Sequence, residues 1–228
     1  MIPAVDLKYL SDADSRSMIA DEIAKAASEA GFVTLHNALE PNSINACFAS
    51  AAKFFALPRD IKMRYACQPF NASNANTYRG YFPLIEGDPS QKEGFEFGQC
   101  RNPDPSFPED IIWPTDEAFK YSLTNMHNSL SNLAMELLQM LCERIQMDDL
   151  TSDFEDGMST FRIIHYPAKI DSESRDSGMQ AYSTPDHTDS GFITLLFQDD
   201  TGGLEALGAG GNWIEVPPRK NSIVMNLG

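Results

Sequence analysis

The sequence predicts a chain of the α+β class, because helical and strand patterns occupy different parts of its 228 residues. In the first half, apolar residues recur at the three- and four-residue spacing of an amphipathic helix. The second half holds short β-branched and aromatic runs between turn signals rich in Gly, Pro and Asp. We expect an N-terminal helical and strand region at 1–112, and a region at 113–228 in which a long helix precedes the strands.

Three helices are expected, each with a recognisable end. The first covers residues 14–30 and stops at Gly31, and Pro41 opens a second helix that closes before Pro58. The longest helix begins near Pro114 and carries one continuous apolar stripe. Because such a stripe is more often core than a partner site, we expect it to be buried. Its members are Phe119, Leu123, Met126, Leu130, Leu133, Leu137, Leu141 and Ile145.

Strand patterns dominate the C-terminal part. The predicted strands cover residues 162–167, 192–197, 213–216 and 222–227. A strong turn signal, Asp-Asp-Thr-Gly-Gly, follows the second of them. Residues 171–180 are polar and without periodicity, so we expect a loop there, serving either as a substrate lid or as a solvated connection.

Composition excludes several partner classes. The formal net charge is −16 at pH 7, and no stretch gathers Lys and Arg as nucleic-acid or anionic membrane binding requires. The four cysteines are widely spaced without a Cys-x-x-Cys pair, which predicts reduced, partly buried thiols. No stretch approaches the roughly 18 apolar residues of a membrane span. We therefore expect a cytoplasmic protein with neither nucleic-acid nor membrane partners.

His187 and Asp189 are the candidate metal ligands and catalytic residues. One residue separates them and an apolar β-type run follows, so on a strand their side chains would share a face. A histidine nitrogen and a carboxylate oxygen are two of the three protein ligands in the 2-His-1-carboxylate site of non-haem Fe(II) oxygenases. No histidine follows His187 in this sequence. The alternative interpretation is a surface histidine beside a solvated aspartate, because His-x-Asp triplets arise readily by chance.

Other candidate sites are weaker. His165 lies between Ile164 and Tyr166 on a predicted strand, so it faces away from Tyr166, and a structural role is favoured over metal ligation. The glycine-rich segment 208–211 has no following helix and no Lys-Ser or Lys-Thr, which predicts a hairpin loop rather than a phosphate site. The sequence has no Gly-x-Ser-x-Gly elbow, so nucleophilic hydrolysis is poorly supported.

Motifs along nearly the whole chain resemble those of a known family. In the C-terminal part these are HTDSGFITLLFQD (187–199), GGLEAL (202–207), GNWIEVPP (211–218) and NSIVMNLG (221–228). Upstream they are FFALP (54–58), YRGY (78–81), KEGFEFG (92–98), WP (113–114) and RIIHYP (162–167). In this order they resemble the isopenicillin N synthase-like Fe(II)/2-oxoglutarate-dependent dioxygenases. The resemblance implies a double-stranded β-helix core of the jelly-roll or cupin kind with flanking helices.

The resemblance also implies a function and roles for residues. The protein would be an oxidoreductase that uses Fe(II), 2-oxoglutarate and O2 to hydroxylate, desaturate or cyclise a small metabolite, in secondary metabolism. His187 and Asp189 would bind the iron together with a second histidine. Tyr166 would donate a hydrogen bond to a carboxylate of 2-oxoglutarate, although a packed strand aromatic is an equal alternative. Asn226 would face the same cavity.

Two other functions stay open at this point. One is an Fe(II)/O2 oxidase of the same superfamily that does not use 2-oxoglutarate, and the other is a truncated, non-catalytic binding protein. In the resembled family a distal histidine and an Arg-x-Ser motif, whose arginine binds 2-oxoglutarate, would lie beyond Gly228. A barrel that ends in a strand would leave an unpaired edge. We therefore expect the sequence to be part of a longer polypeptide of about 300 residues.

Overall fold

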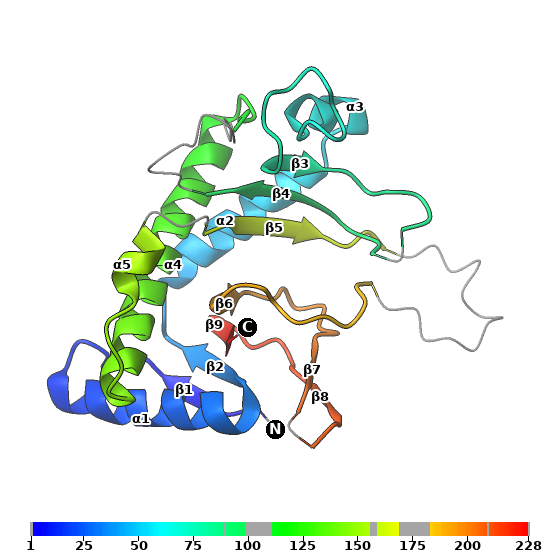
Figure 1. Ribbon diagram of the computed structural model, residues 1–228. Helices are drawn as coiled ribbons and strands as arrows, with labels where there is room; N and C mark the ends of the chain where they lie inside the picture. Colours follow the sequence, from blue (N-terminus) through cyan, green and yellow to red (C-terminus); the bar gives the residue numbers. More distant parts are fainter. Residues whose placement is uncertain are drawn as a thin grey trace. The chain divides into compact units, whose positions relative to one another are not determined.

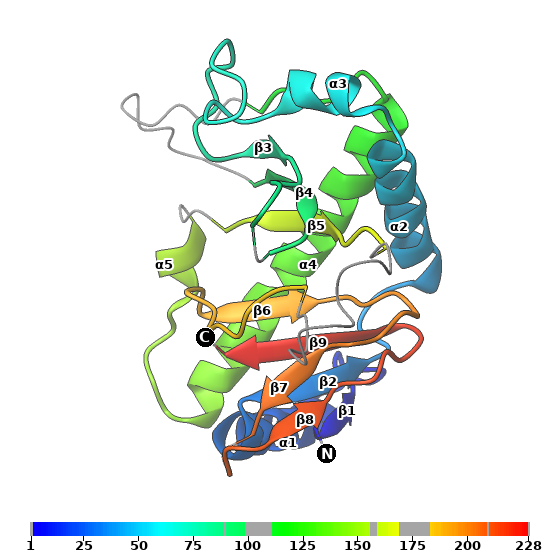
Figure 2. The same cartoon turned by 90° about the vertical axis from the view of Figure 1, so that its right-hand side faces the viewer.

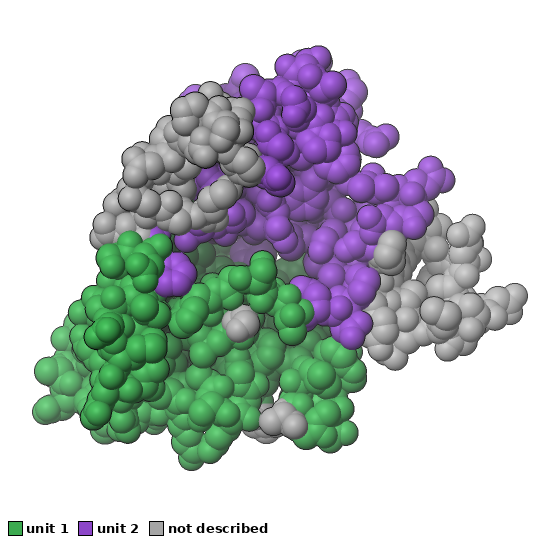
Figure 3. Space-filling view, viewed as in Figure 1, with its two compact units in different colours: residues 1–46, 125–153, 188–228 green, residues 47–124, 154–187 purple. Residues whose placement is uncertain are grey.

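The computed structural model describes residues 2–88, 90–98, 111–155, 159–168, 183–208 and 210–227. The chain divides into two compact units that are interleaved along the sequence (Figure 3). Unit 1 comprises Met1–Ala46, Asn125–Asp153 and Thr188–Gly228, and unit 2 comprises Cys47–Thr124 and Phe154–His187. The predicted division of the sequence near residue 113 stays a prediction.

Unit 1 contains a mixed four-stranded sheet in the order β1-β2-β9-β6 (Figures 1 and 2). Its strands are β1 (Ala4–Asp6), β2 (Phe32–His36), β6 (Ile193–Leu196) and β9 (Ser222–Leu227). The β1–β2 pair is parallel and the other two pairs are antiparallel. A two-stranded ribbon, β7 (Glu205–Leu207) with β8 (Trp213–Glu215), packs its Ala206 against Val216 and Val224.

Helix α1 (Ala13–Ala30) has the ends that the sequence predicts. The Asp12 side chain accepts a hydrogen bond from the Ser15 amide, which caps the first turn. At the other end Gly31 adopts a left-handed φ of 69°, and its amide donates to the Ala27 carbonyl. The glycine turns the chain directly into β2, so the helix packs against the sheet edge formed by β1 and β2.

Unit 2 is built on an antiparallel sheet in the order β3-β4-β5. Its strands are β3 (Gly80–Phe82), β4 (Glu93–Phe97) and β5 (Phe161–His165), and the short segments α3 (Arg59–Lys62) and η1 (Met63–Tyr65) precede them. Phe54 of α2 (Pro41–Phe55) and Phe119 of α4 (Glu117–Arg144) pack on one face of the sheet. The rings of Phe54 and Phe95 are 5.5 Å apart, and those of Phe54 and Phe119 are 4.9 Å apart. An aromatic core therefore fixes the position of this sheet within its unit.

Most of the predicted helices and strands are present. The apolar stripe of α4 is buried from Phe119 to Leu141, as expected for core. Ile145 was wrongly assigned to the stripe: it is 58% exposed, because α4 ends at Arg144 and Gln146 adopts a left-handed φ of 56°. A five-residue helix, α5 (Thr151–Glu155), follows. Cys47, Cys67 and Cys142 are buried, and burial raises the pKa of the Cys47 thiol to about 11.

Two further predictions concern the loop at 171–180 and the segment that carries His187 and Asp189. The predicted loop at 171–180 lies outside the described residues. His187 and Asp189 were expected on a strand, which is wrong, because they lie in the irregular segment before β6 begins at Ile193. Within the described ranges, no helix combines the length and the apolar character that crossing a membrane requires.

Candidate active site

Asp189 is held by two strands of unit 1. The Thr194 hydroxyl donates to Asp189 Oδ2 at 2.7 Å, and the Asn226 side-chain amide donates to the same oxygen at 2.9 Å. Thr194 on β6 and Asn226 on β9 are directly opposite each other in the antiparallel register, so their side chains project from one face of the sheet. The strand pairing thus creates a two-donor clamp for a carboxylate on the preceding loop.

This clamp orients the Asp189 carboxylate through two hydrogen bonds. Both donors are uncharged groups, and a hydrogen bond from such a group to a charged acceptor stabilises by about 1.5–3 kcal/mol. Asn226 was predicted to bind a cofactor. The structure shows it bound to Asp189, a contact that joins two of the predicted site residues.

His187 and Tyr166 belong to unit 2. His187 Nδ1 lies 3.0 Å from the Pro185 carbonyl oxygen. A carbonyl only accepts, so Nδ1 carries the proton, and in the neutral ring the lone pair is then on Nε2. Tyr166 follows the last residue of β5, is 45% exposed, and its hydroxyl lies 3.2 Å from that of Thr184.

The predicted metal ligands are linked by sequence, since only Thr188 separates them, but each belongs to a different unit. Across the ranges that the structure describes, no group of three or more His, Cys, Asp or Glu side chains is arranged to hold a metal ion. The contacts found at Asp189 and His187 therefore concern each ligand by itself.

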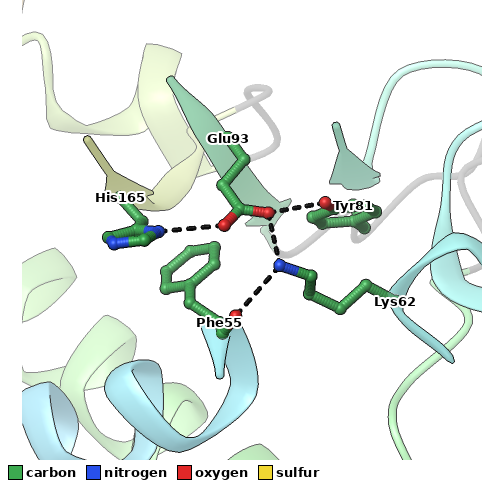
Figure 4. Close-up of polar contacts among 5 residues, drawn as sticks. All are labelled: Phe55, Lys62, Tyr81, Glu93 and His165. Atoms are coloured by element: carbon green, nitrogen blue, oxygen red, sulfur yellow. Dashed lines mark hydrogen bonds and ion pairs between the residues drawn. The ribbon is translucent and has the colours of Figure 1, made fainter. Parts of the chain in front are cut away.

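A buried charged cluster in unit 2 was missed by the sequence analysis (Figure 4). At its centre is Glu93, the first residue of β4, whose side chain is 7% exposed. Glu93 Oε2 accepts hydrogen bonds of 2.6 Å from both Lys62 Nζ and the Tyr81 hydroxyl, and Oε1 lies 2.9 Å from His165 Nδ1. Lys62 Nζ also donates to the Phe55 carbonyl at 2.9 Å. We call these five residues the Glu93 cluster.

The protonation states in this cluster follow from its contacts. Burial favours the neutral carboxyl, but the hydrogen bonds from Lys62, Tyr81 and His165 outweigh it and lower the pKa of Glu93 below its ordinary value. Burial, together with the Glu93 charge, raises the pKa of Tyr81, which stays a neutral donor. The His165 ring stacks on Phe55 with 5.3 Å between centroids, in agreement with the structural role predicted for this histidine.

A signal for the cluster was present in the sequence. Glu93, Phe95 and Phe97 alternate along one strand, so the glutamate points to the same side as two large aromatic residues. A charged residue on an apolar face needs a buried partner, and the pattern could have prompted a search for a lysine. Its partner, Lys62, lies 31 positions earlier in the chain, and no local pattern identifies it.

Two family models together match most of the chain. Residues 2–116 match the N-terminal region described as "non-haem dioxygenase in morphine synthesis", and residues 157–228 match the 2OG-Fe(II) oxygenase superfamily. The curated relatives include a 2-oxoglutarate-dependent dioxygenase, citB, of Monascus ruber. It is 32% identical over 256 residues, which cover 100% of this chain and 74% of citB.

Solved structures agree with these matches. A full-length protein of Neurospora crassa, solved in complex with alpha-KG, has a TM-score of 0.80 at 28% identity, covering 100% of this chain and 71% of the other. A 2OG-Fe(II) oxygenase family protein of Caulobacter crescentus has a TM-score of 0.79 at 28% identity, covering 100% of this chain and 73% of the other. The expected family, fold and cofactors are thereby confirmed, and neither alternative function gains support. The chain belongs to the 2OG-Fe(II) oxygenase superfamily: it is an Fe(II)- and 2-oxoglutarate-dependent dioxygenase with a double-stranded β-helix fold.

Proposed function

We propose that His187 and Asp189 are the iron ligands of this oxygenase, and that Tyr166 binds its 2-oxoglutarate. The observation that carries the proposal is the clamp on Asp189, in which donors from two paired strands converge on Oδ2. A carboxylate held in this way has a fixed direction, and second-sphere hydrogen bonds of this kind orient metal ligands in proteins.

The residues fit Fe(II) chemically. A carboxylate and an imidazole are donors that non-haem Fe(II) accepts. The two hydrogen bonds of the clamp fix the direction of the Asp189 carboxylate, which we assign as one of the metal-binding groups. Because Nδ1 of His187 is directed at the Pro185 carbonyl, we assign ligation to Nε2. The carbonyl contact selects the tautomer and restrains the ring, as a second-sphere acceptor does for a metal-bound histidine.

When bound, Fe(II) supplies the oxidation of the substrate by O2, coupled to decarboxylation of 2-oxoglutarate to succinate. The residues of the chain position the reactants. Tyr166 is half exposed beside Thr184, so its hydroxyl can exchange that partner for a carboxylate oxygen of the co-substrate. Asn226 restrains Asp189 and is the residue through which β9 takes part in the cofactor site.

We further propose that the substrate is a small metabolite and that the enzyme acts in the cytoplasm. The net charge of −16 supports partners that are neither nucleic acids nor anionic membranes, since both attract basic proteins.

The first experiment replaces the two ligands in the full chain. We expect Asp189→Ala and His187→Ala each to abolish Fe(II)-dependent succinate release. His187→Ala should leave the thermal unfolding midpoint nearly unchanged, because His187 is exposed on an irregular segment. Asp189→Ala should keep the fold but lower the midpoint, because it also removes the two hydrogen bonds of the clamp. Asp200→Ala, on the exposed turn after β6, is the matched control. Succinate release that survives in either ligand variant would contradict the assignment.

A further inference from the structure

The β3-β4-β5 sheet has two faces of different chemistry. Its register places Phe82, Gly94 and Ile164 in one row across the strands, and Glu96 opposite Arg162 in the next. Directly opposite residues share a face, and side chains alternate along each strand. These five residues therefore form one face, which we call the open face. The other face carries the aromatic core and the Glu93 cluster.

The open face offers a flat apolar floor. A Cβ atom built on Gly94 would collide with Phe82 Cζ, so the Phe82 ring lies directly over the glycine. Ile164, on the neighbouring strand, is 38% exposed. An aromatic ring next to an exposed isoleucine is a surface that a planar or aliphatic group can cover, with a gain of about 25 cal/mol per Å² of apolar area buried.

The half-exposed Arg162 side chain lies beside this apolar surface. The Arg162 guanidinium lies 5.8 Å from the centroid of the Phe82 ring and forms an ion pair with Glu96. The Arg162 side chain is 47% exposed and that of Glu96 only 14%, so the glutamate holds one side of the guanidinium while much of it faces outward. A guanidinium has five N–H donors in a planar fork, more than one carboxylate satisfies.

A second cation lies near the first. The pKa of Lys92, the residue before β4, is lowered by burial and then by the positive charge of Arg162, while the carboxylates of Asp88 and Glu96 act in the opposite direction. The attraction of this end of the sheet for an anion therefore depends on the outward-facing donors of Arg162.

We propose that the open face binds the substrate, and that the substrate is a small carboxylic acid. Its carboxylate is held by Arg162 and its apolar part lies on Phe82 and Ile164. This inference rests on the proposed function, because Tyr166, two residues beyond Ile164, is the residue assigned to 2-oxoglutarate. Four residues of extended strand span about 13 Å, which separates the backbone positions of Arg162 and Tyr166 and favours two bound molecules over one.

A binding experiment tests the proposal without metal or turnover. The full chain is titrated with phenylacetate and with its neutral analogue phenylacetamide, followed by ligand-observed NMR. We expect phenylacetate to bind about tenfold more tightly, the equivalent of one charge-assisted contact. Arg162→Gln should bring the ratio of the affinities for phenylacetate and phenylacetamide close to one. Arg162→Lys should restore part of the preference for phenylacetate. Arg64→Gln, an exposed arginine on η1, should leave the ratio unchanged.

The outcomes separate this proposal from the one before it. Equal affinities in the unmodified chain, or an unchanged ratio in Arg162→Gln, would overturn the carboxylate site. A 2-oxoglutarate affinity that falls in Arg162→Gln while the phenylacetate ratio persists would assign Arg162 to the co-substrate, which also overturns it. Tyr166→Phe should weaken the binding of 2-oxoglutarate and leave the ratio of the affinities for phenylacetate and phenylacetamide unchanged. If Tyr166→Phe binds 2-oxoglutarate as tightly as the unmodified chain, the role assigned to Tyr166 is wrong, and the conclusion about Arg162 is unaffected.

Discussion

Glu93 in unit 2 and Asp189 in unit 1 are two carboxylates that accept hydrogen bonds from different kinds of donor. Glu93 forms hydrogen bonds with the Lys62 ammonium, the Tyr81 phenol and the His165 imidazole, and the lysine compensates its charge inside the protein. The clamp on Asp189 consists of a hydroxyl and an amide, which orient the carboxylate and bring no positive charge to it. The donors to Glu93 include an ammonium that compensates its charge, whereas the two donors of the clamp are neutral and orient Asp189.

The largest effect on stability is expected at Glu93. Glu93→Gln leaves the buried Lys62 ammonium without its counter-charge, and breaking a buried pair in this way costs about 3–5 kcal/mol of unfolding free energy. Urea unfolding measures the loss. Glu96→Gln, whose partner Arg162 is half exposed, is the control and should cost less than about 1 kcal/mol. Adding Lys62→Met to Glu93→Gln should recover stability, because the unpaired ammonium is removed. Equal losses of unfolding free energy in Glu93→Gln and Glu96→Gln would contradict the prediction.

Thr194→Val tests the clamp on the other carboxylate. It removes one donor to Asp189 and keeps the β-branched shape, so we expect about 10- to 100-fold weaker Fe(II) binding. The unfolding free energy should fall by about 1.5–3 kcal/mol, the contribution of the lost hydrogen bond. Equilibrium dialysis against Fe(II) under anaerobic conditions gives the affinity. Thr201→Val, on the exposed turn after β6, is the matched control. Unaltered iron affinity in Thr194→Val would show that the clamp does not serve a metal ligand.

Tyr166→Phe probes the co-substrate. Loss of one hydrogen bond to a charged group should weaken 2-oxoglutarate binding by about 0.5–3 kcal/mol, with little loss of stability, because the side chain is 45% exposed. Calorimetric titration of 2-oxoglutarate measures the change, and Tyr121→Phe on α4 is the control, since Tyr121 is 73% exposed. An affinity equal to that of the unmodified chain would mean that Tyr166 only packs against its neighbours.

The stability that Glu93 contributes should depend on pH. Its pKa is lowered on folding from the ordinary 4.5, so the stability it contributes is present above that value and is lost as the pH falls through the folded pKa. The gap in unfolding free energy between the unmodified chain and Glu93→Gln should therefore narrow on acidification below 4.5. Urea unfolding of both proteins at several pH values follows the gap. A gap that stays constant would show that the Glu93 charge does not stabilise the fold.

Local patterns predicted the elements well where many residues share a period. The stripe of α4 and the stop of α1 at Gly31 are examples, because each depends on neighbours in sequence. The three-residue strands β1 and β7 were not among the predicted strands. The equally short β8 was predicted, because a Trp-Ile-Glu-Val run is followed there by two prolines.

The candidate site shows where sequence reasoning ends. His187 and Asp189 were found from their spacing and from a family resemblance. The contact between Asn226 and Asp189 spans 37 positions and depends on the pairing of β6 with β9, which no local pattern specifies. The Glu93 cluster depends in the same way on three strands and a helix meeting at one carboxylate. Partners brought together by topology become visible only in three dimensions.

The opposition of Thr194 and Asn226 has a consequence for how faithfully the chain folds. Side chains alternate along β9, so a slip of one residue would turn Asn226 to the other face and present Met225 or Leu227 at its position. A slipped sheet would still bury apolar side chains, but it would lose a donor to Asp189. A metal that binds only the correctly paired form would enrich that form by mass action. Under this assignment, iron supply would contribute to the yield of correctly folded enzyme as well as to its activity.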